Sequence, residues 1–237
     1  ALKGKRKKVM IGTGSMSDPY LHIEEKLCHT RKALELVYKY GHGATLITKS
    51  NMVLRDLDII KKINSKTKCV IQISLSTSDP DICRIVEPNV CNTQERIEVL
   101  NTLRDNGIPT VVWLCPFLPF INDTKENIDK LLDYCIEAKV WGIIFFGVGL
   151  TLRDGNRDYF YKKLDESFPG LKNKYISTFG NSYSIKSPNS YYLTKRIRTR
   201  CKENNIETNP DICFNYLNTF EEKNPVKESF LPGFDFL

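Results

Sequence analysis

Polar side chains of complementary charge occur where three apolar runs of the sequence give way to turns. Residues 12–20, GTGSMSDPY, combine glycines and hydroxyls with the carboxylate of Asp18. Lys49 follows a second apolar run, and Ser74 and Ser76 alternate with apolar residues in a third. Glycine lets a ligand approach the backbone closely, and a fixed anion beside a fixed cation suits a zwitterion. These residue types predict a site for a ligand that carries both an ammonium and a carboxylate group.

Simpler interpretations of the same residues stay open at this point. Residues 12–20 match neither G-x-G-x-x-G nor a P-loop, so they could form a plain turn, and Lys49 could be an ordinary surface lysine. A fourth apolar run leads into residues 115–123, CPFLPFIND, where two prolines stiffen the chain and predict a rigid rim.

Cysteine and histidine are spaced in a way that argues against a metal site made by this chain. No two of the eight cysteines have C-x-x-C spacing, and the three histidines form no metal-ligand pair, which disfavours a metal-dependent hydrolase. Widely spaced thiols within apolar segments are typical of unpaired, buried cysteines. We expect this of most members of the set Cys28, Cys69, Cys83, Cys91, Cys115, Cys135, Cys201 and Cys213.

The candidate residues lie in a chain that alternates short β-branched runs with helical patterns, which is the signature of βαβ units and a parallel sheet. Thr93 is the predicted N-cap of one helix, and Ser187 with Pro188 the predicted N-cap and first residue of another. We expect strands at residues 9–15, 44–48, 69–76, 109–117 and 141–148, and helices at residues 23–40, 54–63, 93–106, 125–139, 157–167, 171–178 and 188–204.

Five strands cannot close an eight-stranded barrel, so we expect an open, curved α/β sheet that lacks a first strand upstream of residue 1. Ligands of such sheets bind at the carboxyl ends of the strands, where the candidate residues lie. We divide the chain into a barrel part, residues 1–155, and a helical extension, residues 156–237, which packs on the barrel and ends in a docked apolar tail.

The formal charge of +7 is concentrated in two basic runs, at residues 3–8 and 195–202. Such runs could follow a nucleic-acid backbone, or they could be solvated surface. No apolar run is long enough to span a bilayer, and residues 1–8 lack the apolar stretch of a signal peptide. We therefore expect a cytoplasmic protein with no membrane partner.

Together, several short stretches resemble radical S-adenosylmethionine (SAM) proteins similar to spore photoproduct lyase, also described as DNA-repair-photolyase-like. The resemblance covers nearly the whole chain. Its stretches are residues 12–20, TKS at 48–50, EP at 87–88, ER at 95–96, PFLP at 116–119, IND at 121–123, LRD at 152–154, FYKKL at 160–164, FPGL at 168–171 and GNSY at 180–183.

The resemblance implies a partial (β/α)6-type TIM barrel that binds SAM beside a [4Fe–4S] cluster. In such enzymes, reductive cleavage of SAM gives a 5′-deoxyadenosyl radical, with flavodoxin or ferredoxin as a typical electron donor. It further implies a lyase-like enzyme for which nucleic acid is a candidate substrate. By position, Ser17 and Asp18 would bind the methionyl ammonium, Lys49 the methionyl carboxylate, Ser74 or Ser76 the ribose, and Pro116 with Phe117 the adenine.

Two departures from the family pattern limit the resemblance. The three cluster cysteines, C-x-x-x-C-x-x-C, would precede residue 1, and no such triplet occurs here. We therefore expect no metal ligands in this chain and no activity from the chain by itself. We favour an N-terminally shortened product, with a natural pseudoenzyme as the alternative. Spore photoproduct lyase also uses a cysteine hydrogen donor where residues 13–17 have none, which puts the thymine-dimer reaction in doubt. The alternative function is a non-catalytic, nucleic-acid-binding remnant of the same barrel.

Overall fold

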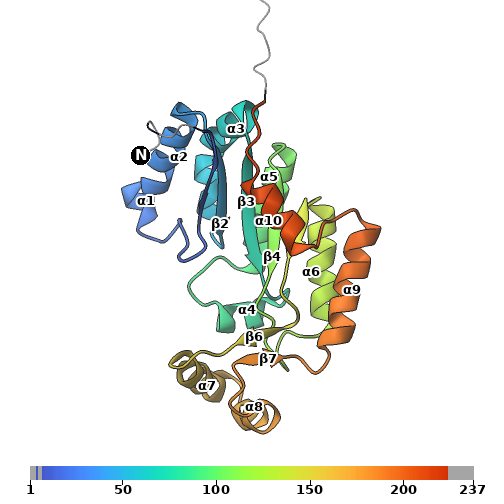
Figure 1. Cartoon of the computed structure of the whole chain (residues 1–237). Coiled ribbons are helices and arrows are strands. Elements are labelled where there is room, and N and C mark those ends of the chain that lie inside the picture. Colours follow the sequence, from blue (N-terminus) through green and yellow to red (C-terminus); the bar gives the residue numbers. More distant parts are fainter. Residues whose placement is uncertain (1–3, 5–6, 224–237) are drawn as a thin grey trace, which may run out of the picture.

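The computed structural model describes residues 4 and 7–223, and its centre is one open sheet of five parallel strands (Figure 1). The strands follow one another in space in the order of the sequence, each paired in parallel register with the next. Within the described residues, the first and last strands do not pair, so the barrel is partial, as expected. The strands are β1 (Met10–Thr13), β2 (Gly43–Thr48), β3 (Cys69–Leu75), β4 (Thr110–Leu114) and β5 (Gly142–Ile144).

Helices cover one face of this sheet because alternate strand residues are apolar and point towards them. In β3, Cys69, Ile71, Ile73 and Leu75 are fully buried in the main core together with side chains of the covering helices. The helices of this layer and its connections are α1 (Glu24–Leu27), α2 (His29–Lys39), the 3-10 helix η2 (Asn51–Asp56), α3 (Leu57–Lys66), α4 (Pro80–Val86), α5 (Thr93–Asp105), α6 (Lys125–Glu137) and α9 (Ser190–Glu203).

The other face of the sheet is the concave face, and one helix near the C-terminus covers its amino-terminal half. Helix α10 (Pro210–Asn218) packs Cys213 and Leu217 against Val70, Val111 and Ile144, and lies in front of the sheet in Figure 1. The carboxyl half of the concave face is polar. There Gln72 donates to Thr45 Oγ1 at 2.8 Å and accepts from Trp113 Nε1 at 2.7 Å.

A small lobe stands beyond the carboxyl ends of the strands (Figure 1). It consists of the antiparallel pair β6 (Gly149–Thr151) and β7 (Ser184–Lys186) with α7 (Asn156–Ser167) and α8 (Leu171–Phe179). Its own apolar core includes Tyr161, Leu164 and Tyr175 and is separate from the main core. The division at residue 155 stays a prediction. Of the helices after residue 155, α7 and α8 build the lobe, whereas α9 and α10 return to pack on α6 and β5.

Several predicted helix ends differ from the structure. Helix α5 begins at Thr93, as expected, but its N-cap is Asn92, which forms a capping box with Glu95. Helix α9 begins at Ser190, because the Ser187 hydroxyl caps a turn by accepting from Asn189 N at 3.1 Å. Residues 54–56, expected in a helix, belong instead to the 3-10 turn η2, whose N-cap is Ser50.

The helix predicted at residues 23–40 is broken at Cys28, which has a positive φ of 51°. Glu24 causes the restart of the helix, because its carboxylate accepts from His29 N at 3.0 Å and Thr30 N at 2.8 Å and so caps α2. Four elements, α4, β6, β7 and α10, were not predicted, and α4, β6 and β7 are shorter than a clear periodic pattern.

The predicted docked tail and most of the first basic run lie outside the described residues. None of the helices in the described part of the chain has the length and apolar character needed to cross a bilayer.

Candidate functional site

The loop that leaves β1 touches the end of β2, and a glycine makes this approach possible. Gly14 has a φ of 101°, and a Cβ atom at this position would lie 2.2 Å from the backbone oxygen of Ile47. No other amino acid fits such a contact, and few tolerate that backbone conformation. Gly14 therefore lets residues 15–18 cross the carboxyl end of the sheet towards Lys49.

Asp18 fastens this loop to the end of β2. Its Oδ1 accepts hydrogen bonds from Tyr20 N at 2.9 Å and Thr48 Oγ1 at 2.7 Å, and its Oδ2 accepts from Lys49 N at 2.7 Å. The structure thus brings Asp18 and Lys49 together at one rim, as the sequence predicted. Three of the roughly four acceptor positions of the Asp18 carboxylate are used inside the protein.

The Lys49 side chain ends in a chain of charges that runs into the protein. Its ammonium lies 2.6 Å from Glu87 Oε1, and Glu87 Oε2 lies 2.7 Å from Arg96 Nη2 in an ion pair without a well-aligned hydrogen bond. Exposure falls along the series, from 32% for the Lys49 side chain to 8% for Glu87 and 1% for Arg96. Burial by itself would raise the pKa of the Glu87 carboxyl, but Arg96 and Lys49 outweigh it and hold the pKa below its ordinary value.

Arg96 joins this charge series to the end of β3. Its Nη1 donates to Ser74 O at 3.0 Å, and its Nε donates to Cys91 O at 2.8 Å. The Ser74 side chain is half-buried on the concave face. Ser74 therefore shares the rim of Asp18 and Lys49.

Ser76 is held by two buried asparagines that follow β4. Its carbonyl accepts from Asn122 Nδ2 at 2.9 Å and from Asn127 Nδ2 at 3.1 Å. Its hydroxyl is buried and has no hydrogen-bond partner among the described residues. A buried hydroxyl without a partner costs free energy, and a ligand that reached this atom would remove that cost.

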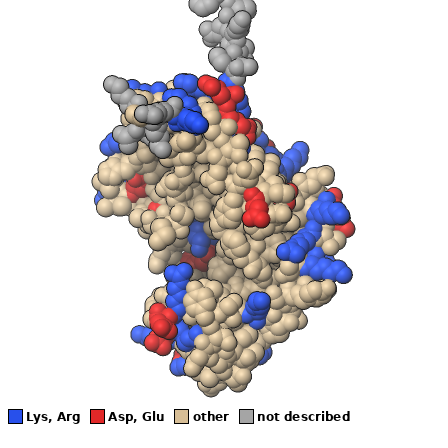
Figure 2. All heavy atoms as spheres, in the orientation of Figure 1, with Lys and Arg blue, Asp and Glu red and all other residues tan. Residues whose placement is uncertain are grey.

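A cavity of about 810 Å³ lies between this rim and the lobe, and Figure 2 shows the corresponding hollow, with acidic and basic side chains inside it. Lys49, Ser76 and Pro116 line its sheet side, and Tyr159 and Lys163 of α7 line the opposite side. The volume is in the range of cavities that hold a cofactor-sized ligand. Further lining residues are Glu87, Asn89, Asn122, Leu150, Leu152, Asn156, Phe160 and Glu166.

Four predicted site residues do not line this cavity, namely Ser17, Asp18, Ser74 and Phe117. Asp18 and Ser74 lie at the rim beside it, bonded to Lys49 N and to Arg96. Ser17 is exposed on the loop after β1. Phe117 is fully buried in the main core, on the helix side of the sheet, so its ring is used in packing. Pro116, its neighbour, is exposed at the rim.

Glu87, Arg96, Asn122 and Tyr159 are part of the site but received no role from the sequence. Glu87 ends α4, a seven-residue helix too short to predict. Arg96 is charged and almost fully buried, which no local pattern reveals. Polar residues in the segment between a strand and the next helix, such as Asn122 between β4 and α6, were the available signal.

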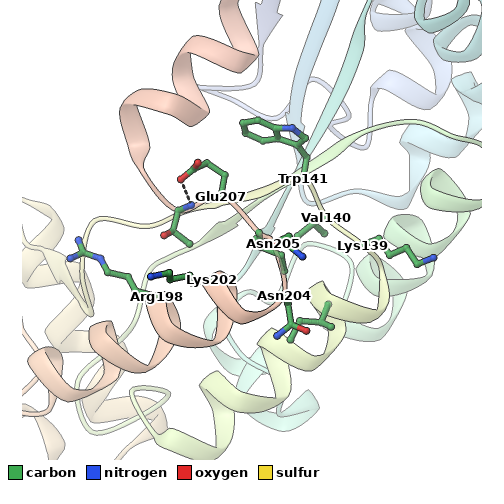
Figure 3. Close-up of a pocket in the computed structure, with 11 residues that line it drawn as sticks. Lys139, Val140, Trp141, Arg198, Lys202, Asn204, Asn205 and Glu207 are labelled. Carbon is green, nitrogen blue, oxygen red and sulfur yellow. Dashed lines mark hydrogen bonds between the residues drawn. The ribbon is translucent and has the colours of Figure 1, made fainter.

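A second cavity, of about 800 Å³, lies at the amino end of β5, away from this rim (Figure 3). Arg198 and Lys202 of the second basic run line it, while Lys139 points away from them in the figure. The other two arginines of the run are engaged within the fold. Arg196 Nη2 lies 2.8 Å from Asp129 Oδ2, and Arg200 Nη2 lies 2.6 Å from Asp133 Oδ1.

The described cysteines do not fit an iron–sulfur cluster. No three Cys, His, Asp or Glu side chains of the described part of the chain gather as metal ligands, and the cysteines are all free thiols. Burial raises the pKa of the Cys69 thiol to about 12, which keeps it protonated, whereas cluster ligands are thiolates.

Comparison with known proteins agrees with this fold. The model of the Radical SAM superfamily matches residues 1–135. An uncharacterized protein of Mycobacterium tuberculosis is 28% identical over 72% of this chain and 49% of its own length. An uncharacterized protein of Methanocaldococcus jannaschii is 28% identical over 73% of the chain and 63% of its own length. The chain therefore spans about half the length of the mycobacterial relative.

Solved structures show the same fold. A mutant of spore photoproduct lyase with a dinucleoside spore photoproduct superposes with a TM-score of 0.64, over 87% of this chain and 63% of that one, at 12% identity. A domain of pyruvate-formate lyase-activating enzyme from Bacteroides vulgatus gives 0.53 over 85% and 97%, also at 12% identity. The family model covers more than half of the sequence, and the open parallel sheet matches that of radical SAM enzymes. This chain belongs to the radical SAM superfamily.

Proposed function

We propose that the chain binds SAM in the cavity between the rim and the lobe, as part of a radical SAM enzyme of the spore-photoproduct-lyase-like type. The observation that carries the proposal is the meeting of Lys49, a third exposed, with the unpartnered hydroxyl of Ser76 on one wall of this cavity. SAM has a carboxylate that Lys49 can bind and ribose hydroxyls that can hydrogen-bond to Ser76. Superfamily membership supports the same ligand.

In this proposal Lys49 binds the methionyl carboxylate, and Ser76 or Ser74 the ribose. Ser17 and the remaining acceptor position of Asp18 receive the methionyl ammonium. The other bonds of Asp18, to Thr48 and Lys49 N, fix where that acceptor points. Pro116 packs near the adenine, whereas Phe117 supports the rim from the core.

SAM beside a reduced [4Fe–4S] cluster supplies the 5′-deoxyadenosyl radical. Because the described thiols do not fit that cluster, we assign no step through it to this chain. Reductive cleavage, an electron donor such as flavodoxin or ferredoxin, and the inactivity of the chain by itself remain parts of the proposal. The residues described here bind SAM and exclude water from it.

Nucleic acid is the substrate class that we propose. Tyr159 is 66% exposed at the cavity, and an exposed aromatic ring suits a stacked base. A spore photoproduct lyase with bound AdoMet and dinucleoside spore photoproduct has the same fold. The non-catalytic alternative would need the basic run of α9, but Arg196 and Arg200 are paired with aspartates.

Calorimetric titration of SAM into the chain tests the proposal. We expect Lys49→Ala and Ser76→Ala each to weaken SAM binding by about tenfold, because each removes one charged or buried polar contact. Lys62→Ala, on the exposed face of α3, is the matched control and should bind as the parent does. Failure of the parent chain to bind SAM, or equal affinity in all variants, would refute the site.

The same chain can be titrated with a fluorescent single-stranded oligonucleotide with and without SAM. Salt-sensitive oligonucleotide binding that Tyr159→Ala weakens is the expected result. Oligonucleotide binding without any SAM binding would favour the non-catalytic remnant instead.

A further inference from the structure

The Lys49, Glu87 and Arg96 series contains two cations and one anion, hence a net charge of one positive unit beside the cavity. Lys49 alone of the three has a substantially exposed side chain, whereas Glu87 and Arg96 are enclosed. Buried ion pairs add little to stability, because desolvation of the two charges offsets their attraction. The enclosed Glu87–Arg96 pair therefore calls for a role other than stability.

The geometry points to a positioning role for Arg96. A lysine paired only with Glu87 would already be neutralised and would attract a second carboxylate weakly. Arg96 lies 2.7 Å from Oε2 of Glu87, the oxygen that Lys49 does not contact, and it neutralises the negative charge of this carboxylate. Glu87 then still holds the Lys49 ammonium at the cavity wall, at 2.6 Å, while the positive charge of Lys49 remains available.

We propose that Arg96, which does not line the cavity, sets the affinity of Lys49 for the carboxylate of the bound ligand by neutralising Glu87. Arg96 is held in place by three contacts, namely its ion pair with Glu87 and its hydrogen bonds to Ser74 O and Cys91 O. The ends of β2 and β3 and the start of α5 thus hold the charged groups of Lys49, Glu87 and Arg96 in place together. The inference rests on SAM as the ligand of the cavity.

Two probes separate this role from a merely structural one. SAM carries the methionyl carboxylate, whereas 5′-methylthioadenosine has the same nucleoside without the amino acid. We expect Arg96→Gln to weaken SAM binding by about tenfold, because Lys49 is then neutralised by Glu87, and to leave 5′-methylthioadenosine binding unchanged. Arg96→Lys keeps the charge and should stay within about threefold of the parent for both probes.

The double variant Glu87→Gln/Arg96→Gln is the decisive control. It removes both enclosed charges, leaves Lys49 unpaired, and should recover SAM affinity to within about threefold of the parent. If Arg96→Gln does not fold, Arg96→Lys and the double variant still test the inference, because the double variant buries no unpaired charge. Continued loss of SAM affinity in the double variant, or equal loss of both probes in Arg96→Gln, would overturn the inference.

The outcomes also separate this inference from the proposed function. A parent chain that binds SAM no better than 5′-methylthioadenosine contradicts SAM recognition through Lys49 altogether. A parent that prefers SAM, with a preference that Lys49→Ala abolishes and Arg96→Gln preserves, contradicts only the role of Arg96.

Discussion

Single side chains fix the positions of whole segments here, and Glu24 is a clear case. It is buried, and it accepts from the first two backbone N–H groups of α2 and pairs with Arg55 at 3.1 Å. Burial by itself would raise the pKa of its carboxyl, but the hydrogen bonds from Thr30, Arg55 and His29 outweigh this and lower the pKa. The ionised form is therefore the one that the fold binds.

The pH dependence of stability follows from that direction. A carboxyl with a lowered pKa contributes stability that is fully present above its unfolded pKa, about 4.3, and is lost as the pH falls through its folded pKa. We expect Glu24→Gln to lower the free energy of unfolding by about 1–2 kcal/mol at pH 7, and by less below pH 4. Urea unfolding at the two pH values measures this, with the exposed Glu25→Gln as control. An equal loss at both pH values would contradict the capping role.

Residue types after strands were enough to predict that Asp18, Lys49, Ser74 and Ser76 share a rim, because parallel strands end at one edge. They could not predict Glu87 and Arg96 as members of the site. Those two act through tertiary contacts between segments 38 and 47 residues from Lys49, and nothing in the local sequence encodes such contacts.

At the scale of elements, α5 is the one on which the rim depends most, because Arg96 lies in its first turn. Asn92 and Glu95 close that turn by reciprocal hydrogen bonds of 3.0 and 2.7 Å. The sequence signal for this capping box is present, but the predicted cap, Thr93, is one residue too late. Asn is a stronger N-cap than Thr, and Glu95 stands three residues after Asn92, so these two signals favoured Asn92 over Thr93.

We expect Asn92→Ala to lower the free energy of unfolding by about 1 kcal/mol, because the Glu95 N–H at the start of α5 loses the side-chain oxygen that accepts from it. Gln94→Ala, in the same turn but exposed and outside the capping box, should change it by less than about 0.5 kcal/mol. Thermal or urea unfolding of the two variants checks this. A Gln94→Ala loss as large as that of Asn92→Ala would show that the loss is not specific to the cap.

For the whole molecule, the repeated strand and helix pattern was enough to predict an open parallel sheet. The lobe was not predicted as a separate unit. Its strands have three residues each, and its core depends on Leu118 and Ile121 from the end of β4 as well as on α7 and α8. Short strands and a core shared between distant segments leave little periodic signal. The placement of α10 on the concave face was likewise outside the reach of sequence patterns.

Two separate cores imply two cooperative units, and amide hydrogen exchange can resolve them. The lobe buries less apolar surface than the body, so its amides should exchange as a group through a sub-global opening, while those of β3 exchange only on complete unfolding. Tyr175→Phe removes the hydrogen bond from the Tyr175 hydroxyl to Pro119 O, 2.7 Å, and should accelerate exchange in α7 and α8 about fivefold or more with little change in β3. Equal acceleration in both regions would mean that body and lobe open together. The lobe supplies one wall of the cavity. The rate at which the lobe opens would therefore limit how quickly a ligand enters and leaves.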